Sequence, residues 1–290
     1  MAGFHFAGTS KILSFAGLDL AKPRIMGVIN ITPDSFSDGG ETFFLKDAVS
    51  RGRSMLAAGA DILDVGGEST RPGALPVSVD EECGRVVPVI AGLSQEGAMV
   101  SIDSRRAKVM AEAFSAGAVI VNDVSALTED SDAIHFISES GMSVVLSHMQ
   151  GEPCNMQNNP SYTVPSEEIF EYLGSRIKAC EVAGIPRPKI AVDPGIGFGK
   201  TLDHNLEILA NIDTYHDLNC ALVIGVSRKS FIGQLANIKV PGDRMPGSIA
   251  AALAARARGV QIFRVHDVAE TRQAFKIWEA IQDTSIRSIR

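Results

Sequence analysis

Short apolar runs alternate along the chain with longer stretches in which apolar residues recur roughly every three to four positions. The short runs are typical of strands buried on both faces, and the longer stretches are typical of amphipathic helices. We expect strands at residues 24–31, 61–65, 98–102, 118–121, 143–147, 189–192, 220–224 and 261–265. We expect helices at residues 46–58, 79–92, 105–115, 131–140, 166–183, 203–212, 246–258 and 268–282.

This alternation predicts an α/β fold with a parallel sheet. Eight strand–helix units in about 250 residues fit a (β/α)8 TIM barrel better than an open, doubly wound sheet. No linker or change of composition interrupts the pattern, so we expect residues 1–290 to form a single domain. Before the first unit, two short apolar segments flank Gly17 and predict an N-terminal β-hairpin that closes one end of the barrel.

Almost every predicted strand ends in a polar residue. In a (β/α)8 barrel the carboxyl ends of the strands face one common mouth. A single polar strand end is usually a cap, but a set that converges on one mouth forms a site. The set is Asn30, Asp64, Asp103, Asn122, Asp123, Ser147, His148, Asp193, Ser227, Arg228, Lys229, Arg264 and His266.

The sixth strand has the most distinctive end. Pro194 cannot donate a ladder hydrogen bond, so the strand stops after Asp193, and three glycines follow before Lys200. The spacing of these glycines fits neither a phosphate-binding loop nor a dinucleotide-binding turn. Taken alone, Asp193 is also compatible with a simple cap of the turn.

The polar strand ends divide into two groups. Carboxylates and a carboxamide suit a flat heterocycle whose edge carries N–H donors and a carbonyl. This first group consists of Asp103, Asn122, Asp193 and Lys229. The second group lies on the first and last strands, where barrels often bind phosphate, and consists of Asn30, Arg264 and His266. Taken alone, Arg264 is also compatible with a surface position and His266 with a cap.

Two long polar loops follow the first and second strands, at residues 31–42 and 66–76. Long loops at the mouth of a barrel commonly act as lids or binding loops. Either loop alone is also compatible with a mobile connector.

Composition and charge narrow the choice of partners. The chain has 27 basic and 34 acidic residues and a net charge of −7, which argues against broad binding to nucleic acid or to a membrane surface. No apolar run approaches about 18 residues, so we expect no membrane span. The four cysteines lack metal-ligand spacing, and the first residues lack the apolar core of a signal peptide. We therefore expect reduced thiols and a cytoplasmic location.

Several sequence blocks resemble the dihydropteroate synthase family, and they follow the family's order across nearly the whole chain. The blocks are residues 26–40 (MGVINITPDSFSDGG), 66–73 (GGESTRPG), 193–200 (DPGIGFGK), 227–230 (SRKS) and 264–268 (RVHDV). Departures are small. Cys154-Asn155 stands where the family often has a basic residue and Thr, and the segment Ile102–Arg105 is a variant.

The resemblance implies a transferase that joins 6-hydroxymethyl-7,8-dihydropterin diphosphate to p-aminobenzoate and releases diphosphate. It assigns the pterin to Asp103, Asn122, Asp193, Lys229, Phe198 and Met149. It assigns the diphosphate to Asn30, Arg264 and His266, with Mg²⁺ as cofactor on Asn30. It assigns p-aminobenzoate to Thr70, Arg71, Pro72, Phe36 and Ser230. It also implies a homodimer and a site that sulfonamides target.

For the reaction we expect a dissociative substitution, because loss of diphosphate can leave a cation that is delocalised into the pterin ring. The expected catalytic residues are Asp103, which stabilises the cation, Lys229, and Asp34 and Arg71 on loops that exclude water. Lys229 is alternatively a Schiff-base nucleophile, as in barrel aldolases. Two other functions stay open: methyl transfer from methyltetrahydrofolate to a corrinoid protein, and pterin binding without catalysis.

Overall fold

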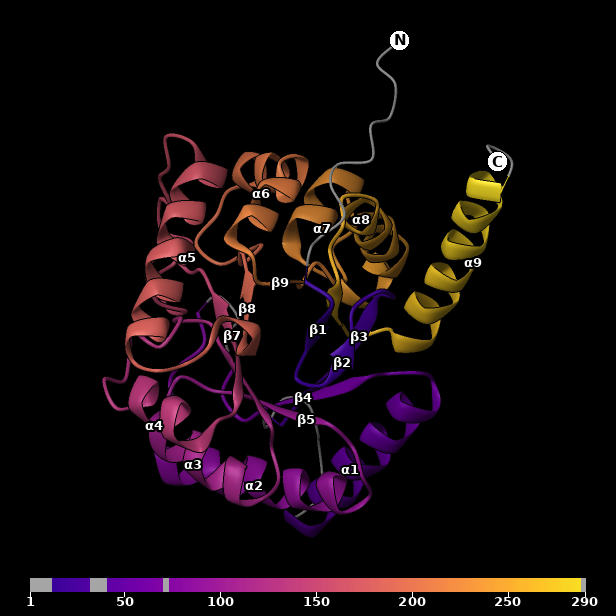
Figure 1. The fold of residues 1–290 in the computed structure, drawn as a ribbon. Helices are drawn as coiled ribbons and strands as arrows, with labels where there is room; N and C mark the ends of the chain where they lie inside the picture. Colours follow the sequence, from indigo (N-terminus) through magenta and orange to yellow (C-terminus); the bar gives the residue numbers. More distant parts are fainter. Residues whose placement is uncertain (1–11, 32–40, 70–72, 288–290) are drawn as a thin grey trace.

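Parallel strands close into a barrel in the computed structural model, which describes residues 12–31, 41–69 and 73–287 (Figure 1). The strands are β3 (Arg24–Asn30), β4 (Ile62–Gly66), β5 (Val100–Asp103), β6 (Ile120–Asp123), β7 (Ser143–Ser147), β8 (Ile190–Asp193), β9 (Ala221–Ile224) and β10 (Ile262–Val265). Each strand pairs with its neighbours in sequence, and β10 pairs with β3 to complete the ring. The predicted (β/α)8 barrel is confirmed.

Helices surround the barrel on all sides (Figure 1). They are α1 (Glu41–Ala57), α2 (Val79–Gln95), α3 (Ala107–Ser115), α4 (Ala133–Ser140), α5 (Pro165–Val182), α6 (Leu202–Ala210), α7 (Ser230–Ala236), α8 (Met245–Ala257) and α9 (Val268–Arg287). Short 3₁₀ turns η2 (Arg187–Lys189), η3 (Ile212–Leu218) and η4 (Pro241–Arg244) complete the connections. The sequence predicts one helix between β9 and β10, whereas the structure has α7 and α8. Helix α7 has 7 residues, which is too short for a helical period to emerge.

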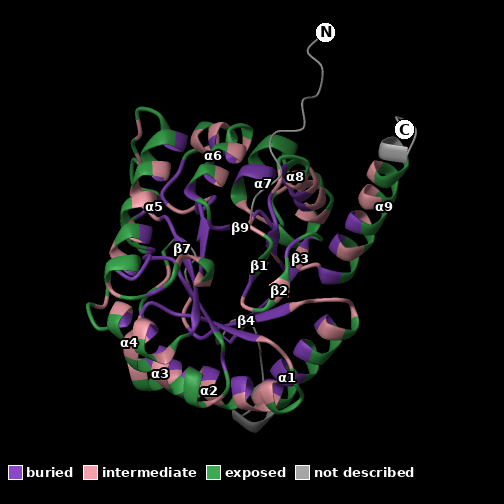
Figure 2. Ribbon diagram, viewed as in Figure 1, coloured by how far each residue is buried: buried purple, intermediate pink, exposed green. Residues whose placement is uncertain are grey.

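The strands bury both faces, which explains their apolar runs (Figure 2). One face packs against the helices in a large apolar cluster, and the other fills the barrel interior. Residues two apart on a strand share a face, and along several strands the interior position changes from apolar to polar at the second step. The pairs are Ile62 and Asp64, Ile120 and Asn122, Ala191 and Asp193, and Ile262 and Arg264. The barrel interior is therefore apolar toward the amino ends of the strands and polar at the mouth.

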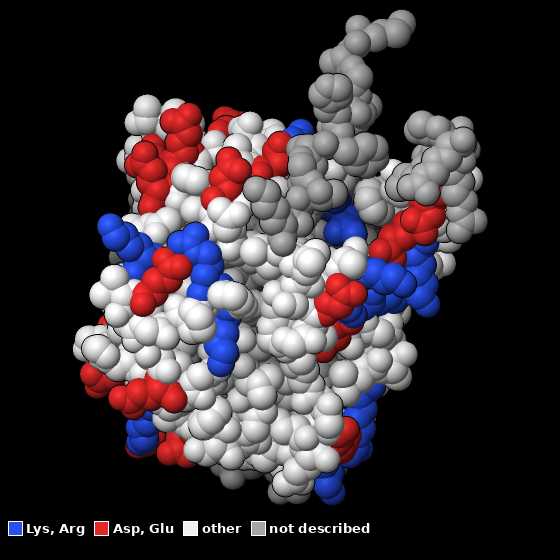
Figure 3. Space-filling view, viewed as in Figure 1, with Lys and Arg blue, Asp and Glu red and all other residues white. Residues whose placement is uncertain are grey.

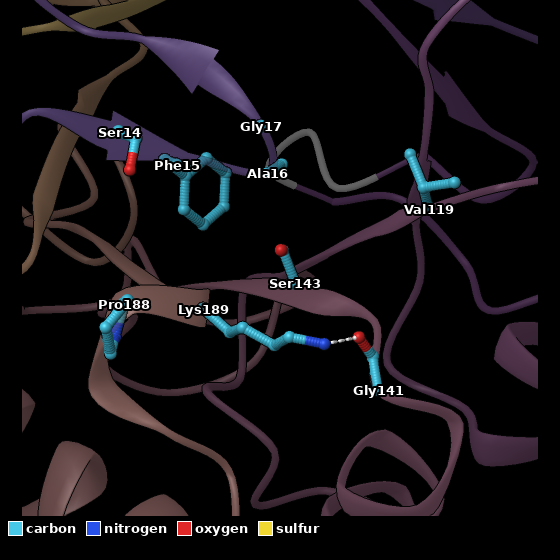
Figure 4. Close-up of a pocket in the computed structure, with 9 residues that line it drawn as sticks. All are labelled: Ser14, Phe15, Ala16, Gly17, Val119, Gly141, Ser143, Pro188 and Lys189. Carbon is cyan, nitrogen blue, oxygen red and sulfur yellow. Dashed lines mark hydrogen bonds between the residues drawn. The ribbon is translucent and has the colours of Figure 1, made fainter.

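The hairpin of β1 (Ser14–Phe15) and β2 (Leu18–Asp19) lies at the amino end of the barrel, as predicted. Phe15 and Leu20 belong to the interior cluster and seal that end. Beside them is a cavity of about 330 Å³, lined by the hairpin and by the starts of β7 and β8 (Figure 4). Its lysine, Lys189, donates a hydrogen bond to the carbonyl oxygen of Gly141. This cavity lies at the end of the barrel opposite to the predicted site.

The surface on the hairpin side shows Lys and Arg interspersed with Asp and Glu around a largely uncharged centre (Figure 3). Among the described helices, none combines the length and the apolar character needed to cross a membrane.

Candidate active site

Polar side chains from neighbouring strands meet at the carboxyl end of the barrel. In the strand register, Gly66 of β4 lies between Asn30 of β3 and Asp103 of β5, and Asp103 lies beside Asn122 of β6. A Cβ at Gly66 would be 3.5 Å from Asp103 Oδ2 and 3.7 Å from Asn30 Oδ1. The absence of a side chain at Gly66 leaves these two groups facing one space. The two predicted groups therefore share one mouth.

Asp64 lies at the centre of a hydrogen-bond network below this space. Its Oδ2 accepts from Arg264 Nε at 2.6 Å and from Asn122 Nδ2 at 3.1 Å. Arg264 also donates from Nη2 to Asp103 Oδ2 at 2.6 Å. Asp64 is 0% exposed, and its Oδ1 has no hydrogen-bond partner among the described residues. The sequence marks Asp64 as a polar strand end but gives it no role, although its two-residue spacing from Ile62 signals the barrel interior.

The environment of Asp103 raises the pKa of its carboxyl group to about 7. Burial is the largest cause, since it disfavours the charged form, and the neighbouring Asp64 charge adds to it. Arg264 opposes both effects. Asp103 therefore changes charge near neutral pH, and a positive charge developing beside it would favour its ionised form.

Arg264 belongs to the predicted anion group but contacts Asp103, a member of the heterocycle group. Its Nε and Nη2 face Asp64 and Asp103, so the guanidinium is oriented toward the heterocycle side of the mouth. These carboxylates raise the pKa of Arg264 against the effect of burial, which keeps it a cation. The predicted anion site therefore shares its arginine with the heterocycle site.

Asp193, Lys229 and Phe198 form the opposite wall of the mouth. Asp193 Oδ1 accepts from the backbone N–H of Gly195 at 2.7 Å, and burial raises the pKa of its carboxyl group. Lys229 Nζ lies 3.9 Å from the ring centroid of Phe198, in cation–π contact. Burial and then Arg264 lower the pKa of Lys229 to about 8. These residues present a carboxylate, an amine and an aromatic face on one side.

His266 is held by the hydroxyl group of Ser227, which accepts from the His266 backbone N–H at 3.2 Å and lies 3.0 Å from Nδ1. Burial, followed by the charge of Arg264, lowers the pKa of His266 to about 3. The imidazole is therefore neutral at physiological pH. If Ser227 donates to Nδ1, the proton is on Nε2, and His266 can donate a neutral hydrogen bond to an anion.

Not every polar strand end faces the mouth. Asp123 follows Asn122 and therefore lies on the other face of β6. Its carboxylate accepts hydrogen bonds from the backbone N–H groups of Ser125 and Leu127 at 2.7 and 2.8 Å. Asp123 fixes the turn after β6 and has no place in the site.

Most of the predicted p-aminobenzoate residues, and the expected catalytic residue Asp34, lie outside the described residues. Asp34, Phe36, Thr70, Arg71 and Pro72 fall outside the described residues. Ser230 is the exposed first residue of α7. Met149, assigned to the pterin, is half-buried in the segment after β7.

The donor set for a metal is small. Among the described residues, no group of three or more His, Cys, Asp and Glu side chains is arranged to hold an ion. Asn30 offers one amide oxygen beside the space left by Gly66. This arrangement suits Mg²⁺, which commonly takes one or two protein oxygens and completes its shell with substrate phosphates and water.

Known proteins with the same fold and sequence pattern are numerous. The sequence profile of the family described as "Pterin binding enzyme" matches residues 26–266. Dihydropteroate synthase of Escherichia coli K12 is 47% identical over 264 residues, which cover 91% of this chain and 93% of that protein. A Yersinia pestis dihydropteroate synthase in a sulfonamide drug complex superposes with a TM-score of 0.87 at 45% identity, covering 92% and 96% of the two chains. A Xanthomonas albilineans dihydropteroate synthase with 4-aminobenzoic acid gives 0.86 at 42% identity, covering 91% and 95%.

The barrel and its mouth thus define a pterin-binding enzyme. Similarity covers nearly the full length of both chains in each comparison, at identities well above those that show a fold alone. Within that class, the chain belongs to the dihydropteroate synthase family, whose members are transferases of folate synthesis.

Proposed function

We propose that this chain condenses 6-hydroxymethyl-7,8-dihydropterin diphosphate with p-aminobenzoate to give 7,8-dihydropteroate and diphosphate, by a dissociative substitution. The observation that carries the proposal is the set of inward-facing groups at the mouth: Asp103, Asn122, Asp193 and Lys229. The carboxylates and the amide in this set match the N–H donors and the carbonyl group on the edge of a pterin. The 4-aminobenzoic acid in the Xanthomonas relative supports the second substrate.

The pterin would be oriented by its edge and its face. Asn122 donates its amide N–H to Asp64, which leaves its amide oxygen to accept from the ligand. Asp193 is held by Gly195, so its carboxylate is oriented before the ligand arrives. Phe198 and Met149 would contact the ring. Desolvated polar groups of this kind discriminate strongly, because a ligand without the matching atoms leaves them unpaired.

Asp103 would stabilise the cation that forms when the carbon–oxygen bond to diphosphate breaks. A fixed carboxylate in a water-poor site acts on developing charge without reorganisation. The positive charge on the pterin favours the ionised form of Asp103. The amine of p-aminobenzoate is already nucleophilic, so the reaction needs no strong base, and His266 with its pKa of about 3 is a poor one.

The leaving diphosphate would meet Nε2 of His266 and the cation Arg264. Asn30 would hold Mg²⁺ through its amide oxygen, and the bound ion would neutralise charge on the diphosphate. The loops that carry Asp34 and Arg71 would exclude water from the cation. Thr70, Pro72, Phe36 and Ser230 would complete the p-aminobenzoate site, which is also where sulfonamides would compete.

The direct test is incubation with the pterin diphosphate, Mg²⁺ and p-aminobenzoate, with diphosphate and dihydropteroate measured together. We expect equal amounts of both products, and loss of turnover when EDTA removes the metal. Release of diphosphate without dihydropteroate would contradict the transfer.

The charge role of Asp103 has its own test. Asp103→Asn keeps the shape but removes the charge, and we expect kcat to fall about 10²-fold or more while pterin affinity falls less. Equal losses in both would refute the charge role. Borohydride treatment with substrate present tests the Schiff-base alternative for Lys229, and a trapped covalent adduct would support it.

The two alternative functions have simple tests. Methylation of a cobalamin by methyltetrahydrofolate would support the methyl transferase. Pterin binding without any turnover would support the non-catalytic protein.

A homodimer and a cytoplasmic location complete the proposal. Leu235 on α7 and Val240 before η4 are exposed apolar residues at 58% and 57%, and such side chains suit a contact between subunits. Light scattering would measure the mass in solution. Free thiols at all four cysteines are compatible with a reducing compartment.

A further inference from the structure

Lys200 is a buried lysine whose role is not explained by the sites described so far. It is 3% exposed, at the end of the glycine-rich segment that follows β8. Its amine lies 3.0 Å from the carbonyl oxygen of Phe198, 3.4 Å from the carbonyl oxygen of His148 and 3.0 Å from His148 Nδ1. None of these three acceptors is a carboxylate. The amine therefore joins two backbone segments, one after β7 and one after β8.

Both segments carry predicted pterin neighbours. Met149 follows His148 in the chain, and the ring of Phe198 lies under the amine of Lys229. The His148 backbone N–H donates to the carbonyl oxygen of Asp193 at 3.0 Å, at the end of β8. Lys200 thus binds the backbone that carries Phe198 and Met149, and not the side chains that are proposed to contact the pterin.

The backbones of the two segments press against each other around Lys200. A Cβ at Gly195 would lie 1.9 Å from the carbonyl oxygen of His148, and a Cβ at Gly199 would lie 2.3 Å from that of Gln150. Both glycines have positive φ, 70° and 62°. Aromatic contacts add to this packing, since the His148 ring meets the ring of Tyr172 edge-on at 4.9 Å. Glycines are required here because the two segments are in contact, and the hydrogen bonds of Lys200 stabilise that contact.

The hydrogen bonds that Lys200 forms with the two segments do not depend on its charge. Burial lowers the pKa of its amine well below the usual range, while Asp193 opposes this effect. As an ammonium, the group donates three N–H bonds, and three acceptors are present. As a neutral amine, it donates to the two carbonyl oxygens and accepts from His148 Nδ1–H. His148 itself stays neutral, because burial and then Lys200 lower its pKa to about 3.

We propose that Lys200 is a positioning residue for the pterin. By joining the segments after β7 and β8, it sets the separation and orientation of Met149 and Phe198, and hence the width of the slot that receives the ring. The role rests on the proposed function, because it concerns the affinity of the same site for the pterin. Lys200 acts through Phe198 and His148 and does not contact the substrate.

The test compares two lysines that each donate to a backbone carbonyl oxygen. Lys200→Met removes the amine and keeps most of the side-chain volume. We expect the Kd for 6-hydroxymethylpterin, which lacks the leaving group, to rise about tenfold in calorimetry, as for the loss of a buried hydrogen bond. The KM for p-aminobenzoate at saturating pterin diphosphate should stay the same. Lys189→Met, at the hairpin end, is the matched control and should change neither quantity.

A purely structural role predicts a different result. In that case Lys200→Met would lower the melting temperature and bind the pterin like the wild type, which would overturn the proposal. If Lys200→Met does not fold, Lys200→Gln keeps an N–H donor and should show a smaller rise in Kd. Wild-type affinity in folded Lys200→Gln would also overturn it. The binding assay needs no turnover, so failure of the wild type to form dihydropteroate would count against the proposed function alone.

Discussion

Asp64→Asn should make the enzyme less stable and yet active at lower pH. Asp64 and Asp103 share the guanidinium of Arg264, with both contacts at 2.6 Å. The substitution removes the negative charge of Asp64, so Arg264 is left to Asp103 alone. Loss of a hydrogen bond to a charged group costs about 1.5–3 kcal/mol of unfolding free energy.

The magnitude of the pH effect follows from Coulomb's law. Two carboxylates on one guanidinium lie roughly 5 Å apart, and at an effective dielectric constant of about 20 they repel by about 3 kcal/mol. One pKa unit corresponds to about 1.4 kcal/mol, so removing this repulsion should lower the pKa of Asp103 by roughly two units. The proposed role of Asp103 requires its ionised form, so activity should fall as the pH drops through its pKa of about 7. The acid limb should therefore move to lower pH in Asp64→Asn.

The assay is the pH dependence of kcat/KM for the pterin diphosphate, which reports the pKa values of the free enzyme. The matched control is Asp61→Asn, since Asp61 also pairs with two arginines, Arg24 at 2.8 Å and Arg272, but before the start of β4. It should lose stability without moving the acid limb. An acid limb that stays in place, or moves to higher pH, in folded Asp64→Asn would refute the coupling of the two carboxylates through Arg264.

Two other predictions concern the loops at the mouth. Gly195→Ala places a Cβ 1.9 Å from the carbonyl oxygen of His148, so we expect chemical denaturation to show that the unfolding free energy falls by about 3 kcal/mol or more. Gly73→Ala, at a residue with a φ of 82° and nothing within 4 Å, should lose only about 1 kcal/mol of unfolding free energy. Similar losses in the two variants would contradict the clash. Glu68→Gln should raise the KM for p-aminobenzoate in steady-state kinetics. One carboxylate oxygen of Glu68 accepts hydrogen bonds from Arg106 at 2.6 Å and from the Val77 backbone N–H at 3.1 Å, so Glu68 holds together the two ends of the loop at residues 68–77. Glu129 also pairs with Arg105, but it forms no hydrogen bond with the described residues of that loop, so an equal rise in KM in Glu129→Gln would contradict this role of Glu68.

The sequence predicts the barrel well because the fold repeats one local pattern. Each strand is a short apolar run buried on both faces, and each run is followed along the chain by a stretch with the helical period. Errors in where an element begins or ends therefore do not change the predicted topology. Helix α7 was missed because 7 residues show no period. Polar strand ends also predict the mouth, since parallel strands place all their carboxyl ends on one side.

Pairing between side chains explains what the sequence does not predict. Nothing local to Asp64 indicates that Arg264, 200 residues away, will bind it. Lys200 stands in a recognisable motif, but two of its three partners, the carbonyl oxygen and Nδ1 of His148, belong to the segment after β7. Asn122 and Asp123 are adjacent in sequence, but their side chains point to opposite faces of β6. Only the two-residue period of the strand indicates that Asn122 faces the mouth and Asp123 does not.

The seal formed by Phe15 and Leu20 has a consequence for proton exchange. Among the described residues, this apolar layer lies on one side of the buried Asp64–Arg264–Asp103 network, and the mouth lies on the other. A pterin bound at the mouth, as proposed, would cover the open side of that network. Proton exchange between these three groups and bulk water should therefore be slower with the pterin bound than without it.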